Sequence, residues 1–144
     1  MIELAEVLEF GERFHHVVGT EKGSGEDQSA FFLHPEPRIF ILHEADVSLA
    51  GNWEIHQRIG EEHFEWMEPW SITQLCDEPE RARATGAVLW QGQSLDQDGL
   101  MQMIVGEDWI VQRIDDGSLR FALYVNTFHY PVPGAATVSI KVSD

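Results

Sequence analysis

The second half of the chain constrains the fold most strongly, because it contains long β-type segments separated by turn-forming sequences. We predict strands at approximately residues 66–76, 83–94, 107–114 and 118–130. The sequences between them favour tight turns: Asp77-Glu78-Pro79, Asp98-Gly99 and Asp115-Asp116-Gly117. Long strands joined by short turns pair antiparallel. This half of the chain therefore predicts an antiparallel sheet, to which TVSIKV (137–142) adds an edge strand or a loose tail.

The first half of the chain has a helical pattern instead. Residues 2–18 repeat apolar side chains with the 3.6-residue period of an amphipathic helix, and Gly19 is a natural stop. A shorter helix starts at Ser24 and ends before Pro35, and residues 38–42 form a buried strand. A third helix covers 52–64, with Gly51 or Asn52 as its cap. Helices followed by antiparallel strands predict an α+β fold with three N-terminal helices packed on one face of a bent sheet.

Composition sets the broad class of protein. With 144 residues, 43% of them hydrophobic, we expect a single domain over residues 1–144. No apolar run reaches the roughly 18 residues that span a bilayer, and the first residues are acidic, so we expect a soluble cytoplasmic protein without a secretory signal. The lone cysteine, Cys76, predicts a buried small residue. A net charge of −16 disfavours nucleic-acid and membrane partners and favours solubility and a neutral or cationic small partner.

Three histidines fall on the inward faces of predicted helices. His15 lies in the apolar stripe of the first helix, where it is either an acid-base group or a core histidine bonded to a backbone carbonyl. On the third helix, His56 and His63 share one stripe, about 10 Å apart along the axis. His56 is the better candidate for a pocket residue, and His63 is expected at the helix end as a cap or rim residue.

A metal site is not predicted, although the chain has seven histidines. The spacings HExxH, HxH and paired Cys-His are all absent. A metal-dependent oxygenase or hydrolase would need His15, His56 and Asp46 to converge from distant segments. We expect neither a metal nor a cofactor.

Two stretches carry a resemblance to a known family. DQSAFFLHPEPRIFILHEADVSLAGNWEIHQ (27–57) resembles the second helix, first strand pair and third helix of the nuclear-transport-factor-2-like superfamily. DWIVQRIDDGSLRFALYVNTF (108–128) resembles its closing hairpin. Together with the element order, the resemblance covers nearly the whole chain. It is closest to the SnoaL-like type, which includes polyketide cyclases, ketosteroid isomerase and scytalone dehydratase.

The resemblance implies a cone-shaped α+β barrel, with the helices packed on a strongly curved, mainly antiparallel sheet around an apolar cavity. It also implies a homodimer through the other sheet face and either cofactor-free acid-base chemistry or pure ligand binding. Asp46 lies near the position where family isomerases place a catalytic carboxylate. The first helix has no tyrosine to contribute to an oxyanion hole, which argues against steroid isomerisation.

The candidate site follows from these points. We predict His15, His56 and Asp46 as catalytic residues of a lyase or isomerase, and Phe14, Trp53, Tyr124 and His129 as ligand-binding residues for a hydrophobic or aromatic small molecule. The alternative is a noncatalytic domain that binds a hydrophobic ligand or only dimerises. Strict alternation along the last strand places one row toward the core (Leu119, Phe121, Leu123, Val125, Thr127 and His129) and the other on the dimer face (Arg120, Ala122, Tyr124, Asn126, Phe128 and Tyr130). With the opposite facing, Tyr124 and Asn126 would become pocket residues and His129 would leave the site.

Overall fold

The computed structural model describes residues 1–34, 38–41 and 47–136. The first half contains α1 (Leu4–His15), a π-helical turn η1 (His16–Thr20), α2 (Gly25–Ser29), β1 (Arg38–Ile41), β2 (Val47–Ser48) and α3 (Leu49–Gln57). The second half consists of β3 (Ile59–Asp77), β4 (Glu80–Ser94), β5 (Leu100–Arg113) and β6 (Leu119–Pro131). The predicted order of helices followed by long strands is confirmed. The predicted strand at 137–142 lies outside the described residues.

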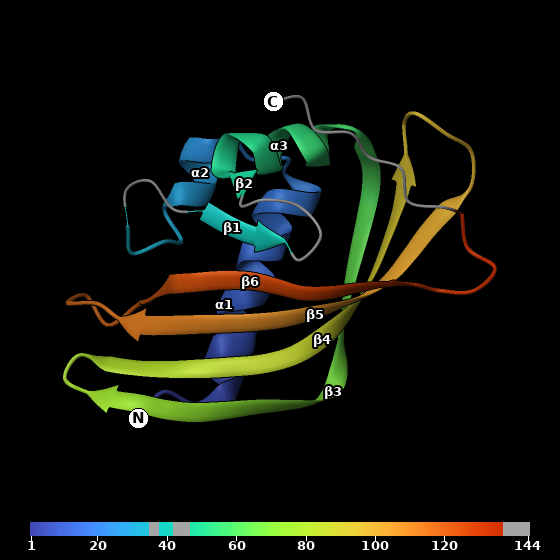
Figure 1. Cartoon of the computed structure of the whole chain (residues 1–144). Helices are drawn as coiled ribbons and strands as arrows, with labels where there is room; N and C mark the ends of the chain where they lie inside the picture. The colour runs from blue at the N-terminus through green and yellow to red at the C-terminus, as the bar shows by residue number, and fades with distance from the viewer. Residues whose placement is uncertain (35–37, 42–46, 137–144) are drawn as a thin grey trace.

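The strands form one six-stranded sheet in the order β2-β1-β6-β5-β4-β3. Neighbouring strands are antiparallel, except that β1 runs parallel to β6. Figure 1 shows β3 turning sharply partway along its length and the sheet curving around α1, with α2 and α3 gathered at one end. The predicted α+β class, with three helices packed on a strongly curved and mainly antiparallel sheet, is therefore confirmed.

Irregular pairing accompanies this curvature. The β3–β4 register shifts between Ile59/Glu62, Met67/Ser71 and Gln74/Cys76, and the β5–β6 register shifts between Gly106/Glu107 and Ile110/Val111. A bulge bends the strand that carries it and increases the local twist. It also changes which residues face inward, because side chains alternate only while the pairing is regular.

The prediction of a third helix over 52–64 was wrong at both ends. Ser48 caps α3 by accepting a hydrogen bond from the Gly51 amide at 3.1 Å, so the helix begins earlier than expected. It ends at Gln57, and β3 pairs with β4 from Ile59 onward. Sheet pairing outweighs local helical preference here. His63 consequently lies exposed on β3 instead of on an inward helical stripe.

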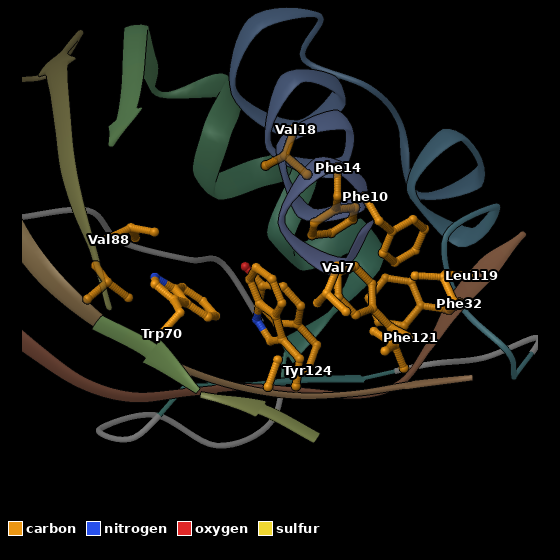
Figure 2. Close-up of a cluster of buried hydrophobic side chains, with 14 of the residues drawn as sticks. Val7, Phe10, Phe14, Val18, Phe32, Trp70, Val88, Leu119, Phe121 and Tyr124 are labelled. Atoms are coloured by element: carbon orange, nitrogen blue, oxygen red, sulfur yellow. The ribbon is translucent and has the colours of Figure 1, made fainter. Parts of the chain in front are cut away.

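The core lies between α1 and the concave face of the sheet. Phe10 and Phe14 on α1 pack against Phe121 of β6, with ring centroids 4.6 and 5.3 Å apart. Figure 2 shows these aromatic side chains meeting between the helix and the sheet. Each fully buried large apolar side chain stabilises the fold by about 1.5–3 kcal/mol. At Gly11 an added Cβ would lie 2.6 Å from the Trp109 ring, so glycine allows α1 to approach β5 closely.

The strict alternation predicted for β6 was wrong in its middle. Phe121 and Tyr124 are both buried although they are three residues apart, because the register shift at Ile110/Val111 lies between their partners. Asn126 also turns inward and reaches Glu107. The shift at Gly106/Glu107 restores the original facing, so His129 pairs with the buried Val105. Phe128 and Tyr130, which were predicted on the dimer face, are exposed.

Two further expectations concern the lone cysteine and membrane-spanning segments. Cys76 was predicted to be buried, but it lies exposed near the end of the edge strand β3. Within the described ranges, no helix combines the length and apolar character needed to cross a bilayer.

Candidate functional site

A histidine-carboxylate pair joins the end of α3 to the start of β3. The His56 Nδ1 atom lies 2.9 and 2.7 Å from the two oxygens of Glu62. His56 and Glu62 are only six residues apart in the sequence. The helix α3 ends between them at Gln57, and the register shift that follows turns both Ile59 and Glu62 inward. A carboxylate on Nδ1 fixes the orientation of the imidazole and directs proton exchange to Nε2.

Glu62 is buried and accepts two further hydrogen bonds. Lys22 Nζ donates to Oε2 at 2.6 Å, and Trp90 Nε1 donates to Oε1 at 2.7 Å. Burial alone would raise the pKa of Glu62. The hydrogen bond and charge of His56, with the hydrogen bonds from Lys22 and Trp90, hold this pKa below its ordinary value. Glu62 is therefore a carboxylate at neutral pH.

The chain approaches Glu62 closely from the end of the first helix. Gly19 lies in the π-helical turn η1, and an added Cβ there would be 2.7 Å from the Phe64 ring and 3.3 Å from the Glu62 Cβ. Lys22 follows with a φ of 54°, in the left-handed region that side-chain-bearing residues rarely adopt. This local conformation brings the lysine ammonium to the buried carboxylate. Strained backbone of this kind recurs at functional sites.

His15 is buried next to this pair. Its ring stacks on Phe64 with centroids 4.2 Å apart, and Trp66 and Trp109 lie at 5.3 and 6.0 Å. Within the described part of the chain, neither ring nitrogen has a hydrogen-bond partner, so the predicted backbone carbonyl is not found there. Burial, and secondarily the charge of His56, lower the pKa of His15 to about 3. His15 is thus a neutral imidazole with one unmatched donor and one unmatched acceptor.

A second buried carboxyl group lies on the concave face of β5. Glu107 Oε2 accepts hydrogen bonds from Trp109 Nε1 at 2.9 Å and from Asn126 Nδ2 at 2.8 Å. Burial raises the pKa of Glu107 to about 8, although hydrogen bonds with Trp109, Asn126 and Tyr124 oppose the shift. Glu107 is therefore mainly a neutral carboxylic acid at pH 7. Figure 2 shows Tyr124 rising from β6, with its hydroxyl oxygen in the interior.

The other predicted site residues occupy different surroundings. Phe14 is fully buried against Phe121 and Tyr124, at 5.3 Å from each ring. Trp53 is 39% exposed on α3. Asp46 lies outside the described residues. Of the predicted residues, the structure places His15 and His56 together, and Tyr124 beside Glu107.

The residues that sequence reasoning missed are Glu62, Lys22, Trp90 and Glu107. Glu62 was hidden by the incorrect extension of the third helix. A period-two pattern in the sequence places Glu62, Phe64 and Trp66 on one face, but residues 59–64 also fit a helical stripe, so this signal alone does not select the strand. Lys22 and Trp90 come from distant segments, and no sequence signal connects them to Glu62.

In the ranges 1–34, 38–41 and 47–136, no group of three or more histidine, cysteine, aspartate or glutamate side chains is arranged to hold a metal ion.

The fold of the chain is similar to that of several solved structures. No family model matches the sequence, and no curated protein matches it. A scytalone dehydratase-like protein of Novosphingobium aromaticivorans superposes with a TM-score of 0.71 at 9% identity, over 98% of this chain and 91% of that one. The hexachlorocyclohexane dehydrochlorinase LinA-type3 of Novosphingobium barchaimii gives 0.67 at 10% identity, over 94% and 93%. ActVI-ORFA of Streptomyces coelicolor gives 0.64 at 16% identity, over 87% and 95%.

These similarities confirm the fold predicted from the sequence. The chain shares the fold of these three structures, a helix-covered, strongly curved sheet of the kind that the sequence resemblance implied. At such low identities the similarity establishes the architecture, whereas the chemistry depends on this chain's own residues.

Proposed function

We propose that the chain binds a small molecule between its helices and the concave face of the sheet, and that His56 acts on it as a general base in a cofactor-free lyase or isomerase reaction. The observation that carries the proposal is the pairing of His56 Nδ1 with the buried Glu62 carboxylate. A histidine oriented by a buried carboxylate is a common general-base arrangement. Two of the structural neighbours are named as a dehydratase-like protein and a dehydrochlorinase, and both names describe eliminations.

The proposed step is a proton transfer from carbon. His56 Nε2 takes a proton from an acidic C–H bond of the ligand, and the electron pair of that bond moves into the ligand. In a lyase reaction, this electron pair then expels a leaving group from the ligand. In an isomerase reaction, the ligand instead takes the proton back at another atom. Glu62 stabilises the imidazolium that forms, and Lys22 balances the charge of Glu62 in the resting state.

His15 has a different role in this proposal from the proton carrier that the sequence suggested. With its pKa lowered to about 3, it stays neutral during the reaction and contributes hydrogen bonds to the ligand. Asp46, Trp53 and His129 remain predicted site residues. The apolar cavity and the cytoplasmic location also remain predictions.

A general-base probe tests the proposal without knowledge of the natural substrate. 5-Nitrobenzisoxazole is a neutral aromatic compound that opens by simple proton abstraction from carbon, with no cofactor. We expect the protein to accelerate this opening over an equal concentration of free imidazole. Replacing His56→Gln should reduce kcat/KM by about 10²–10⁴-fold, the usual contribution of a positioned general base.

The matched control is His63→Gln, because His63 is an exposed histidine seven residues farther along the same chain segment. That variant should retain wild-type turnover. Equal activity of the His56 and His63 variants would remove His56 from the mechanism. No acceleration by the wild-type protein would favour the alternative, a noncatalytic ligand-binding or dimerisation domain.

We also propose a homodimer through the convex face of the sheet. All three helices lie on the opposite face (Figure 1), and the convex face carries half-exposed apolar side chains at Leu89, Ile104, Ile110, Leu123 and Val125. In a chain of net charge −16, Arg81, Arg83 and Arg120 place three of the nine basic residues on these same strands. Arg83 pairs with Asp108 at 2.6 Å, so Arg81 and Arg120 supply the local positive charge that lowers the repulsion between two copies.

Sedimentation analysis tests the dimer. Ile104→Arg introduces a charge into the apolar set beside its register partner Leu89, and we expect it to shift the dimer to monomer at micromolar concentration. Glu9→Arg, on the exposed side of α1, should leave the association unchanged. A wild-type protein that sediments as a monomer would contradict the proposal.

A further inference from the structure

Trp109 connects two polar groups that the proposed proton transfer does not use. The distal ring atoms Cη2 and Cζ3 of its indole lie against Gly11 of α1, and its Nε1 donates to Glu107 on β5. His15 lies 6.0 Å from the Trp109 ring in an edge-to-face arrangement. The indole thus extends from α1 to the sheet, with His15 near its helix end and Glu107 at its nitrogen.

The hydrogen bonds of Glu107 define the position of its proton. Two N–H groups, Trp109 Nε1 and Asn126 Nδ2, donate to Oε2. In the neutral acid the proton therefore resides on Oε1, and a ligand oxygen that accepts from Oε1–H would share this position with the Tyr124 hydroxyl. A ligand carbonyl or hydroxyl oxygen is the complementary group.

The groups that face Glu107 carry no formal charge at neutral pH. On β5 its neighbour is Trp109, on β6 they are Tyr124 and Asn126, and on β4 its register partner is Gly86. From α1 the nearest titratable group across Trp109 is His15, which is itself neutral. Burial, and secondarily the charge of Glu107, raise the pKa of Tyr124, so it too stays protonated. Among the described residues, no cation in this set would stabilise an anion.

We propose that Glu107 and His15 provide two uncharged hydrogen-bonding contacts to one ligand, an uncharged aromatic molecule whose polar group both donates and accepts, such as a carboxamide or a hydroxyl. This inference rests on the proposed function and narrows its ligand class. A carboxylate analogue is excluded, because its charge would be buried beside Glu107 without a cationic partner. Ionisation of Glu107 also removes the Oε1–H donor, so binding should weaken as the pH rises.

A matched pair of probes tests this selection. 2-Naphthamide is uncharged and 2-naphthoate is anionic across the range from about pH 6 to pH 9, and the two molecules have nearly the same shape. Binding can be followed by quenching of tryptophan fluorescence and confirmed by calorimetry. We expect 2-naphthamide to bind at least about tenfold more tightly than 2-naphthoate at pH 7, and its affinity to fall about tenfold between pH 7 and pH 9.

Two variants separate the contacts. Glu107→Gln keeps an uncharged donor and acceptor at every pH, so it should bind 2-naphthamide within about threefold of wild type and lose the pH dependence. His15→Leu should weaken binding about tenfold at all pH values and keep the dependence. Glu9→Gln, exposed on α1, serves as the control that changes neither.

Several results would overturn the inference: equal affinity for the two probes, binding of neither, or the same loss of affinity with pH in Glu107→Gln. Its failure is distinct from failure of the proposed function, which is read from turnover of 5-nitrobenzisoxazole and its loss in His56→Gln. A protein that turns over that compound but binds the two naphthalenes equally retains the general base and loses the proposed selectivity.

Discussion

Two buried glutamates, Glu62 and Glu107, lie on the concave face of the same sheet and have opposite charge states. Glu62 is 6% exposed and Glu107 is 3% exposed, so burial does not distinguish them. The pKa of Glu62 lies below the ordinary value, whereas that of Glu107 is raised to about 8. The difference comes from their partners. Lys22 brings positive charge to Glu62 and His56 adds a hydrogen bond at 2.7 Å, whereas the described partners of Glu107 are an indole, an amide and a phenol.

The comparison shows how one chain provides two kinds of polar contact. In the proposed reaction the ionised carboxylate orients a base and stabilises its conjugate acid, and in the proposed complex the neutral carboxyl group donates a hydrogen bond to an uncharged ligand. Pairs of titratable groups whose surroundings move their pKa values apart are typical of acid-base sites. This difference agrees with the roles proposed above, in which Glu62 acts in proton transfer and Glu107 in ligand selection.

The same substitution at both positions breaks the comparison most directly. At pH 7, Glu62→Gln removes the negative charge that pairs with Lys22 and His56, and we expect a loss of about 3 kcal/mol in the free energy of unfolding. This corresponds to a fall of roughly 10 °C in Tm for a chain of this size. Glu107→Gln replaces one neutral group with another and should cost less than about 1 kcal/mol. Urea unfolding of the two variants measures both values.

Lys22→Met is the control for the first variant. It removes the cation and leaves Glu62 in place, so it should raise the pKa of Glu62 and destabilise the fold at neutral pH. Equal stability of Glu62→Gln and Glu107→Gln would show that the two glutamates do not differ in charge state.

The pH dependence of stability sharpens the comparison, because the two shifts act in opposite directions. Glu62, with a lowered pKa, contributes stability that is present above about pH 4.5 and is lost on acidification. For Glu107 the pKa is raised, so its contribution is complete below about pH 4.5 and is lost as the pH rises to about 8. From about pH 6 to pH 8, wild type should lose roughly 2 kcal/mol relative to Glu107→Gln. Urea midpoints at several pH values measure this difference, and parallel profiles would contradict it.

The fold was predictable because its signals are local and periodic. The first helix, the Ser24 cap and the long strands with their turns follow from hydrophobic spacing and turn-forming residues. The boundary between α3 and β3 was not predictable in the same way. Residues 59–64 fit a helical stripe, and only their pairing with β4 makes them a strand.

The site was predicted in part, for a related physical reason. His15 and His56 were identified from helical facing, and the structure places them near each other. The facing of Tyr124 and Asn126 depends on a bulge between β5 and β6, and the convergence of Glu62 with Lys22 and Trp90 depends on contacts 40 and 28 residues apart in sequence. Register shifts and long-range contacts leave no periodic trace in the sequence, so strict alternation assigned two inward residues of β6 to the wrong face.

His15 extends the comparison to a buried group that has no polar partner among the described residues. Leaving a buried donor and acceptor unmatched costs about 1–3 kcal/mol, whereas an apolar side chain of similar size fits the surrounding Phe64, Trp66 and Trp109. We therefore expect His15→Leu to raise the free energy of unfolding by about 1 kcal/mol at pH 7. The lowered pKa of His15 means that its stability contribution is lost as the pH falls below about 6.5, so the advantage of the variant should widen in acid. Thermal unfolding at pH 7 and pH 5 measures the effect. A variant less stable than wild type at both values would show that His15 is satisfied in solution and does not hold its hydrogen bonds for a ligand.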